Sequence, residues 1–167
     1  MKRCCITGHT TGLGLALYTH LVAEGWAVDG FSRSNDHDIT KNFDAIVEQI
    51  AGCDLFINNA FAKGYQLPLL LALQSRVKKM VVCGSIVSDI PDPIMIEYSK
   101  QKVLLEQSFL KIASEKDIGV ADLLLLKLTS SSYNNPSIVI DTIEFWIKHA
   151  DMIVATFNVT DDGPNRY

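Results

Sequence analysis

Three side chains in the second half of the sequence have the types and spacing that suit proton transfer. Tyr98 and Lys102 are four residues apart in a helical pattern, so they lie on one helical face, one turn apart. A phenol with a pKa of about 10 is a poor acid at neutral pH, but a neighbouring ammonium favours the phenolate. Ser85, 13 residues before Tyr98, adds a hydroxyl that could orient a substrate carbonyl. The alternative is an ordinary helix-surface pair and a serine in a turn.

A glycine-rich string, Thr7-Gly8-His9-Thr10-Thr11-Gly12-Leu13-Gly14, lies between an expected strand and an expected helix. In that context such a string indicates a dinucleotide site. Gly8 permits a tight exit from the strand, Gly12 lets the backbone approach a pyrophosphate, and Gly14 lets the helix lie close to the sheet. The helix N-terminus offers N–H donors to anionic oxygens. A plain glycine-rich turn is the alternative.

Two polar segments follow other expected strands. Asn58-Asn59-Ala60 ends a strand where the crevice of a parallel sheet opens. Ser32-Arg33-Ser34 ends the second strand, where sites that prefer NAD usually place an acidic residue for the ribose 2′-OH. An arginine between two hydroxyls suits a 2′-phosphate instead, because guanidinium pairs with phosphate in a fork geometry. The sequence therefore favours NADP(H) and leaves NAD(H) open; a solvated loop arginine is the alternative.

Composition and charge limit the class of protein. The chain has 167 residues, of which 48% are hydrophobic and 20% charged, so we expect a single globular domain over residues 1–167. The formal charge is −4 and there is no basic block, which argues against a nucleic-acid partner. The apolar run at the N-terminus is too short for a signal peptide, and no run approaches the ~20 residues of a membrane span. We expect a cytoplasmic protein.

Cysteine and histidine show no pattern that suits a metal. The four cysteines lie in apolar stretches without metal-ligand spacing, which predicts buried, reduced thiols (Cys4, Cys5, Cys53 and Cys83). The four histidines share no metal spacing either. The sequence therefore predicts no metal site.

Apolar runs of strand length alternate with longer helical patterns along the whole chain. This alternation predicts an α/β fold, with a doubly wound parallel sheet in three α/β/α layers. The expected strands are 4–7, 26–32, 54–58, 80–83, 120–126 and 152–159. The expected helices are 12–24, 42–50, one within 63–79 that begins at Pro68, 94–114 and 138–149.

Taken in order, the glycine spacing, Asn58-Asn59-Ala60 and the set of Ser85, Tyr98 and Lys102 resemble the short-chain dehydrogenase/reductase family over most of the chain. The resemblance implies a Rossmann-type fold and an NADP(H)-dependent oxidoreductase that interconverts a carbonyl and an alcohol on a small molecule by hydride transfer. It makes Tyr98 the acid/base. Lys102 would lower its pKa and hold the nicotinamide ribose, and Ser85 would position the reacting oxygen.

The same resemblance implies a cofactor-binding set and an assembly. The set consists of Gly8, Thr10, Thr11, Gly12, Leu13, Gly14, Ser32, Arg33, Ser34, Asp38, Asn58, Asn59, Ala60, Tyr98 and Lys102. Asp38 is similar to the family acid that contacts the adenine amino group; a carboxylate at a helix N-terminus is the alternative. Members of the family often pair through the helices flanking the strand before the serine, so a homodimer or homotetramer is compatible with this chain.

The chain departs from the family pattern between its matching residues. No helix fits between Arg33 and Asp38, so the third family strand is at most a stub and the adenine side is open. No asparagine lies between Asn59 and Ser85, so the tetrad asparagine has no counterpart. Phe61 replaces a glycine and narrows the nicotinamide pocket. Lys127, in place of a Pro-Gly, either meets a cofactor phosphate or an acidic substrate, or extends along the strand end to solvent.

Near its end the chain has a short lid segment, residues 130–136, and Asp161-Asp162-Gly163, which resembles a C-terminal Asp-Gly of the family. The short lid leaves the substrate unspecified. With the missing asparagine, it also supports an alternative function, a catalytically weakened dinucleotide-binding module that senses redox state or binds a partner. A purely structural relic is the third interpretation.

Overall fold

The computed structural model describes residues 1–89, 93–115, 119–129, 132, 134–149 and 154–159. At its centre six strands form one parallel sheet in the order β2-β1-β3-β4-β5-β6. The strands are β1 (Arg3–Thr7), β2 (Ala27–Phe31), β3 (Leu55–Asn58), β4 (Lys79–Ser85), β5 (Asp122–Leu128) and β6 (Val154–Val159). Each corresponds to a strand that the sequence predicts.

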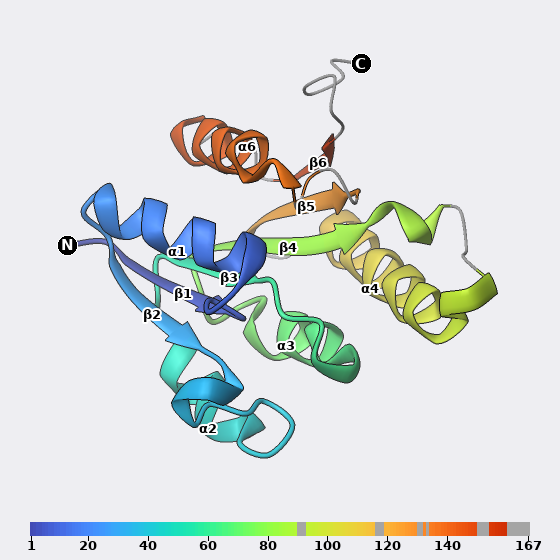
Figure 1. The fold of residues 1–167 in the computed structure, drawn as a ribbon, viewed down its shortest axis with the longest axis horizontal. Coiled ribbons are helices and arrows are strands. Elements are labelled where there is room, and N and C mark those ends of the chain that lie inside the picture. Colours follow the sequence, from blue (N-terminus) through green and yellow to red (C-terminus); the bar gives the residue numbers. More distant parts are fainter. Residues whose placement is uncertain (90–92, 116–118, 130–131, 133, 150–153, 160–167) are drawn as a thin grey trace.

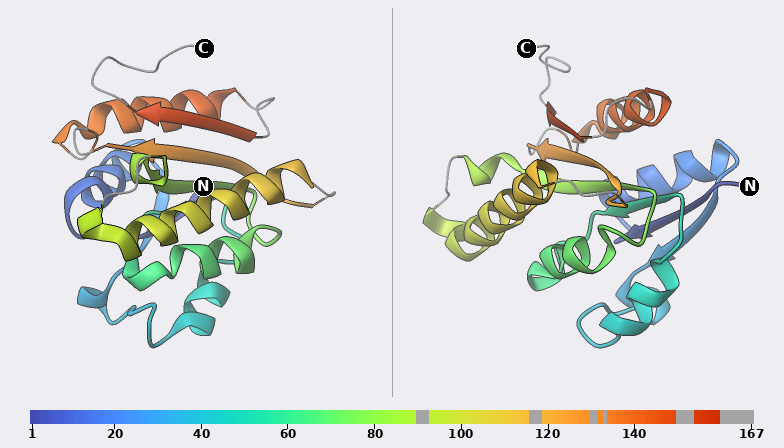
Figure 2. Two further views of the ribbon diagram at one scale, coloured as in Figure 1. Left: turned by 90° about the vertical axis from the view of Figure 1, so that its right-hand side faces the viewer. Right: turned by 180° about the vertical axis from the view of Figure 1, so that it is seen from behind.

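Helices cover both faces of this sheet. Figure 1 shows α1 and α6 on one face and α2, α3 and α4 on the other, and Figure 2 shows the same layers from two further sides. The helices are α1 (Gly12–Ala23), α2 (Phe43–Ile50), α3 (Gln66–Leu73), α4 (Ile96–Ser114) and α6 (Pro136–Lys148). The predicted three-layer, Rossmann-type arrangement is therefore confirmed.

The core lies in two apolar layers, one on each face of the sheet. Successive side chains of a strand point to opposite faces, so Phe56 packs toward α2, α3 and α4, whereas its neighbour Ile57 packs toward α1 and α6. Both residues are fully buried. Burial on both faces explains why the central strands read as nearly continuous apolar runs. Trp146 of α6 is also fully buried and packs this helix onto the sheet.

Two element boundaries differ from the predictions and affect the site. Helix α3 begins at Gln66, so Pro68 lies within the first turn, where its missing N–H costs no hydrogen bond. Strand β4 continues to Ser85, which pairs with Leu128 at the end of β5. Pairing with β5 thus holds Ser85 within the sheet, where the sequence placed it just beyond a shorter strand.

Strand β2 is the edge of the sheet. After β2 the chain makes a short 3-10 turn (Arg33–Asn35) and runs to α2 with no further strand. A hollow of about 390 Å³ lies along the exposed side of β2, lined by Arg3, Val28, Asp29, Gly30, Phe31, His37 and Gln49. The third family strand is therefore missing and this side of the sheet is open, as predicted. Among the described residues, no helix is long and apolar enough to cross a bilayer.

Candidate active site

The glycine-rich turn joins β1 to α1 at the point where the chain order reverses in the sheet. Strand β1 pairs with β2 on one side and β3 on the other, and the carboxyl ends of β1 and β3 border the crevice where open α/β sheets bind ligands. Gly8 and Gly12 both have positive φ, 73° and 53°, which favours glycine. No atom of the described residues would lie within 4 Å of a Cβ at Gly12, so this part of the structure leaves open space beside the turn.

Gly14 serves a different purpose from Gly12. A Cβ at Gly14 would lie 2.0 Å from the Gly8 carbonyl oxygen and 2.8 Å from Asn59 Nδ2. Helix α1 can therefore lie against the turn only because this side chain is absent. The N-cap residue Thr11 makes no side-chain cap, and Thr10, Thr11 and Gly12 are exposed, whereas Leu13 is buried beneath them. The first turn of α1 thus presents uncapped N–H groups beside the crevice.

Asn59 ties the end of β3 to the glycine-rich turn. Its Nδ2 donates to the Thr7 carbonyl at 3.0 Å and to the Gly8 carbonyl at 3.4 Å. The backbone N–H groups of Asn59 and Ala60 both donate to Thr7 Oγ1, at 3.1 and 3.0 Å. These bonds fix the turn relative to β3. The predicted cofactor residues Gly8, Asn59 and Ala60 are therefore brought together.

Asn58, by contrast, is directed inward. Its side chain is fully buried, and its Nδ2 donates to the Gln66 carbonyl at 2.8 Å. Its Oδ1 has no hydrogen-bond partner among the described residues. Asn58 therefore holds the start of α3 against β3, and its side chain is not exposed to the crevice.

The segment after β2 forms an exposed polar turn. The hydroxyls of Ser32 and Ser34 are 2.7 Å apart, and Asn35 Oδ1 accepts from the Ser32 N–H at 2.9 Å. Arg33 between them is exposed. The two hydroxyls are therefore in contact on an exposed turn that also carries Arg33, and phosphate binding by this turn stays a prediction.

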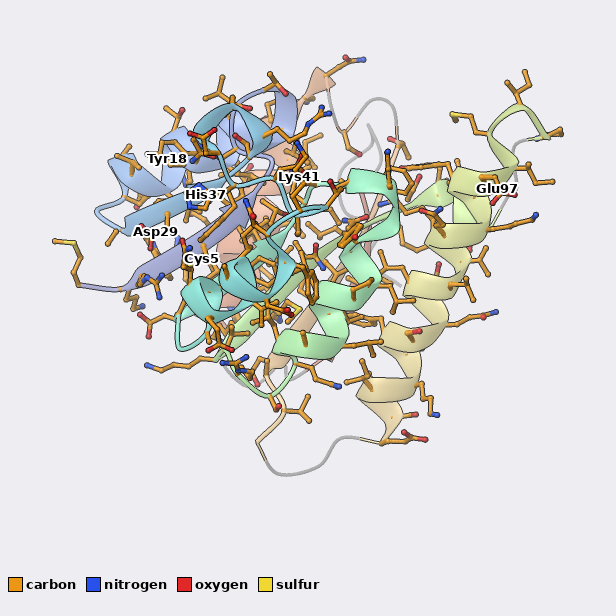
Figure 3. The ribbon with its side chains drawn as sticks, turned by 90° about the horizontal axis from the view of Figure 1, so that it is seen from below. Cys5, Tyr18, Asp29, His37, Lys41 and Glu97 are labelled. Carbon is orange, nitrogen blue, oxygen red and sulfur yellow. The ribbon has the colours of Figure 1, made fainter. Side chains whose placement is uncertain are left out.

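Asp38 stabilises the turn that leads into α2. Its Oδ1 accepts from the Thr40 N–H and hydroxyl, at 3.0 and 2.8 Å, and its Oδ2 lies 3.9 Å from Lys41 Nζ. The Thr40 hydrogen bonds, with smaller contributions from Lys41 and Arg33, lower the pKa of Asp38. These bonds close a local turn between Asp38 and Thr40, whereas the N-cap of α2 is Asn42, so both interpretations of Asp38 stay predictions. Figure 3 shows Lys41 and His37 on this side of the molecule and Glu97, at the start of α4, on the other, with α3 between them.

Ser85 and Tyr98 form the centre of the candidate active site. Their hydroxyls are hydrogen-bonded to each other, Ser85 is 8% exposed and Tyr98 is half-buried. The last residue of β4 and a residue in the first turn of α4 are therefore brought together. Burial raises the pKa of Tyr98, and the Ser85 hydrogen bond opposes that rise.

Lys102 lies beneath this pair. Its Nζ donates to Gln66 Oε1 at 2.6 Å and to the Cys83 carbonyl at 2.8 Å, and it lies 5.4 Å from the centroid of the Tyr98 ring. The side chain is 3% exposed, and burial lowers the pKa of Lys102 to about 8. The prediction that Lys102 lowers the pKa of Tyr98 is wrong for this arrangement, because the ammonium is turned toward Gln66 and Cys83 and burial dominates the pKa of the phenol.

Gln66 is the residue at this site that sequence reasoning missed. It opens α3, is 2% exposed, and contacts Lys102 directly. Gln66 lies in the segment between Asn59 and Ser85, in which the sequence has no asparagine. The sequence signal that could have identified Gln66 is that this single amide directly precedes the apolar run 67–73. A buried amide in such a run requires hydrogen-bond partners.

Phe61 packs against both Tyr98 and Lys102. The two rings meet edge to face with their centroids 4.7 Å apart, and the Phe61 centroid lies 5.8 Å from Lys102 Nζ. An aromatic ring thus lies beside the acid/base candidate, and its narrowing of a nicotinamide pocket stays a prediction.

Lys127 is a buried lysine that belongs to a partly exposed charge cluster. It is 7% exposed, and its Nζ contacts carboxylate oxygens of Asp89 and Glu106, the latter at 2.9 Å. The expected extension of Lys127 to solvent is wrong, because the side chain is buried and paired with two carboxylates; a contact with a cofactor phosphate or an acidic substrate stays a prediction. The cluster connects β5, α4 and the segment after Ser85.

The four cysteines are free and buried, as predicted. Burial raises the pKa of Cys83 to about 12, and burial also raises the pKa of Cys4.

A cluster of three polar side chains lies between α1 and α6. The potential metal-ligand atoms of His20, Glu24 and Glu144 are within 4.8 Å of one another. His20 Nε2 and Glu144 Oε1 are 2.7 Å apart, and Lys148 also pairs with Glu144. This cluster joins α1 to α6. The lid residues 130, 131 and 133 and Asp161-Asp162-Gly163 lie outside the described residues.

Known proteins resemble this chain in structure. An oxidoreductase of the short-chain dehydrogenase/reductase family from Brucella ovis has a TM-score of 0.73 and 16% identity over 96% of this chain and 100% of that one. The 3-alpha-hydroxysteroid dehydrogenase from Pseudomonas sp. B-0831, complexed with NADH, has a TM-score of 0.71 and 17% identity over 95% of this chain and 94% of that one. BdcA, in complex with NADPH, has a TM-score of 0.66 and 13% identity over 94% of this chain and 93% of that one.

No family model matches the sequence, and no curated protein matches it significantly. The likeness to solved structures extends over nearly the whole chain at low identity, and therefore concerns the fold. This chain has the fold of the short-chain dehydrogenases/reductases.

Proposed function

We propose that this chain is a nicotinamide-dinucleotide-dependent oxidoreductase of the short-chain dehydrogenase/reductase type, acting on a small carbonyl or alcohol. The observation that carries the proposal is the hydrogen-bonded pair of Ser85 and Tyr98 with Lys102 beneath it. Ser85 ends β4, and the glycine-rich turn follows β1, so both lie at the carboxyl edge of the same parallel sheet. Solved relatives in fold are complexed with NADH or NADPH.

The glycine-rich turn fits a dinucleotide. Space above Gly12, the positive φ of Gly8 and Gly12, and the uncapped start of α1 suit a pyrophosphate. Ser32, Arg33 and Ser34 would bind a ribose 2′-phosphate, so we propose a preference for NADP(H) over NAD(H). Bound at this site, the reduced nicotinamide would supply a hydride to a carbonyl carbon.

The protein's own residues handle the oxygen and its proton. The Ser85 hydroxyl donates a hydrogen bond that orients the substrate carbonyl, and the Tyr98 hydroxyl transfers its proton to that oxygen as the carbonyl carbon is reduced. Because burial raises the pKa of Tyr98, the phenol is protonated at neutral pH and suits the direction of carbonyl reduction. The Lys102 ammonium supplies positive charge 5.4 Å from the centroid of the phenol ring.

The proposal is tested first by cofactor binding. NADPH, which binds the native state, raises the melting temperature more than NADH at equal concentration. A larger shift with NADH would overturn the Arg33 argument, and no shift with either would overturn dinucleotide binding. The second step follows NADPH absorbance with a panel of small aldehydes and ketones, where substrate-dependent oxidation is expected.

A second function, a dinucleotide-binding module that senses redox state, is supported by two observations. Phe61 packs on Tyr98, and Lys102 is held by Gln66 and Cys83. Both restrict the site. This function predicts cofactor binding with no oxidation of NADPH by any carbonyl in the panel, so the same two measurements discriminate between the functions.

A further inference from the structure

We propose that Gln66 is a positioning residue that fixes Lys102 under Tyr98 and sets the charge of its amine. The Gln66 carboxamide connects three elements, since it begins α3, contacts Lys102 of α4, and donates to carbonyls at the ends of β3 and β4. This role deepens the proposed function, although the geometry of the carboxamide does not depend on turnover.

Hydrogen bonding allows Gln66 only one amide orientation. Its Nε2 donates to the carbonyls of Asn58 and Cys83 at 2.9 and 3.0 Å, whereas its Oε1 accepts from Lys102 at 2.6 Å. Carbonyls only accept and an ammonium only donates. A flipped amide would therefore set oxygen against oxygen and N–H against N–H. The carboxamide oxygen is thus directed at Lys102 by the strand ends themselves.

Helix α3 is also held at its first residue. Asn58 Nδ2 donates to the Gln66 carbonyl at 2.8 Å, while Gln66 Nε2 donates to the Asn58 carbonyl. This reciprocal pair is buried, because Asn58 is fully buried and Gln66 is 2% exposed. Removing either partner would leave buried polar groups unsatisfied. Gln66 is therefore a rigid support for the ammonium that it contacts.

Few charges compete with Gln66 for control of Lys102. Among the described residues, the titratable groups that face Lys102 are the Cys83 thiol on β4 and the Tyr98 phenol on its own helix. Gln66 on α3 and Phe61 on the segment after β3 carry no charge. Burial lowers the pKa of Lys102 to about 8, so a small further shift would change the protonated fraction of the amine at physiological pH. One hydrogen-bond acceptor can therefore shift its charge.

The test measures the ionisation of Lys102 directly. Protein labelled with ¹³C-lysine is titrated by NMR, and the Lys102 ¹³Cε signal is assigned by its loss in Lys102→Met. Gln66→Met removes an acceptor from the charged amine and lowers its pKa, whereas Gln66→Glu places a carboxylate beside it and raises the pKa by about one unit or more. Gln74→Met, on the last turn of α3 and away from Lys102, is the matched control and leaves the titration unchanged.

Turnover is measured on the same variants. Gln66→Met is expected to lower kcat about tenfold or more with a smaller effect on KM, because it disturbs the groups around Tyr98 and leaves the substrate contacts. Opposite shifts of the Lys102 titration in protein without any turnover would support the positioning role and overturn the proposed oxidoreductase. An unmoved titration in active protein would overturn the positioning role alone.

A measurement on the unmodified chain keeps the inference testable if a Gln66 variant fails to fold. The Gln66 side-chain amide protons are bonded to buried carbonyls, so they exchange with water at least about tenfold more slowly than those of Gln74. Equal exchange rates for the two glutamines would show that the carboxamide is not held, and would overturn the proposal.

Discussion

The glycine-rich turn and the Tyr98 site lie at the same edge of the sheet but are built differently. Backbone conformation defines the turn, through positive φ at Gly8 and Gly12 and the missing Cβ of Gly14. Side-chain contacts between distant elements define the other site, where Lys102 on α4 contacts Gln66 on α3 and the backbone of β4. The geometry of the turn therefore depends on the residue type at each position, whereas the geometry of the Tyr98 site depends on how distant elements pack.

This difference determines how each region responds to substitution. An exposed polar turn has many solvated states available, so its variants are expected to change ligand binding more than stability. A buried polar network leaves unsatisfied groups when one member is removed, so its variants affect chemistry, ionisation and stability together. Four predictions test the contrast, in decreasing order of expected effect.

The largest effect is expected for Tyr98→Phe, which removes the proton donor and keeps the ring packed on Phe61. We expect a loss of about 10²–10⁴ in kcat with NADPH binding retained. The assay is NADPH oxidation together with a thermal shift. Tyr65→Phe is the control, because the Tyr65 ring packs on Phe43, on the side of α3 that faces α2. Equal activity in Tyr98→Phe and the unmodified protein would remove Tyr98 from the mechanism.

Substitutions at Gly14 and Gly12 should separate effects on stability from effects on cofactor binding. Gly14→Ala brings a Cβ within 2.0 Å of the Gly8 carbonyl oxygen, so overpacking should lower the free energy of unfolding by about 1–3 kcal/mol and weaken cofactor binding. Gly12→Ala meets no atom within 4 Å and costs about 1 kcal/mol for its positive φ. Its greater effect is to obstruct the pyrophosphate. Urea unfolding measures the loss of stability and cofactor titration measures the loss of affinity. Equal losses of stability in the two variants would contradict the steric argument.

A smaller effect on affinity alone is expected for Arg33→Ala. Loss of a charge-assisted contact should weaken NADPH binding by roughly tenfold and leave NADH binding unchanged. Stability stays the same because Arg33 is exposed. Arg76→Ala, which breaks an exposed pair with Glu48 on α2, is the control and should change neither affinity. If Arg33→Ala weakens NADPH and NADH equally, the guanidinium does not read the 2′-phosphate.

The smallest effect concerns the pH dependence of stability. The pKa of Lys102 is about 8 in the folded protein and 10.5 unfolded, so between these values the unfolded chain binds more protons. Stability from this group therefore rises with pH, by about 1 kcal/mol between pH 7 and pH 9. Buried thiols with raised pKa values act in the opposite sense at higher pH.

The difference between the unmodified protein and Lys102→Met isolates this contribution, because the thiols are common to both. Urea unfolding at pH 7, 8 and 9 measures it. The stability of the unmodified protein is expected to gain on that of Lys102→Met as pH rises, and a constant difference would show that Lys102 is not held at a lowered pKa.

The sequence predicted the strands, the helices and the glycine-rich turn well, because apolar periodicity and glycine spacing are local properties of a chain. The missing third strand could be read from the few residues between Arg33 and Asp38. The start of α3 was predicted at Pro68, two residues late, since the proline signal holds anywhere in the first turn. The pKa of Tyr98 could not be predicted, because helical spacing places Lys102 near it without saying which acceptor the ammonium contacts.

Residue types and spacing alone determined the layered fold, the open edge at β2 and the candidate set of Ser85, Tyr98 and Lys102. Only the tertiary structure decided that Gln66 receives the Lys102 ammonium, that two carboxylates neutralise Lys127, and that Asn58 faces the core. The reason is physical. Local patterns specify which face of an element is buried, whereas the partner of a buried polar group depends on elements far apart in the chain that meet only when the sheet and helices pack.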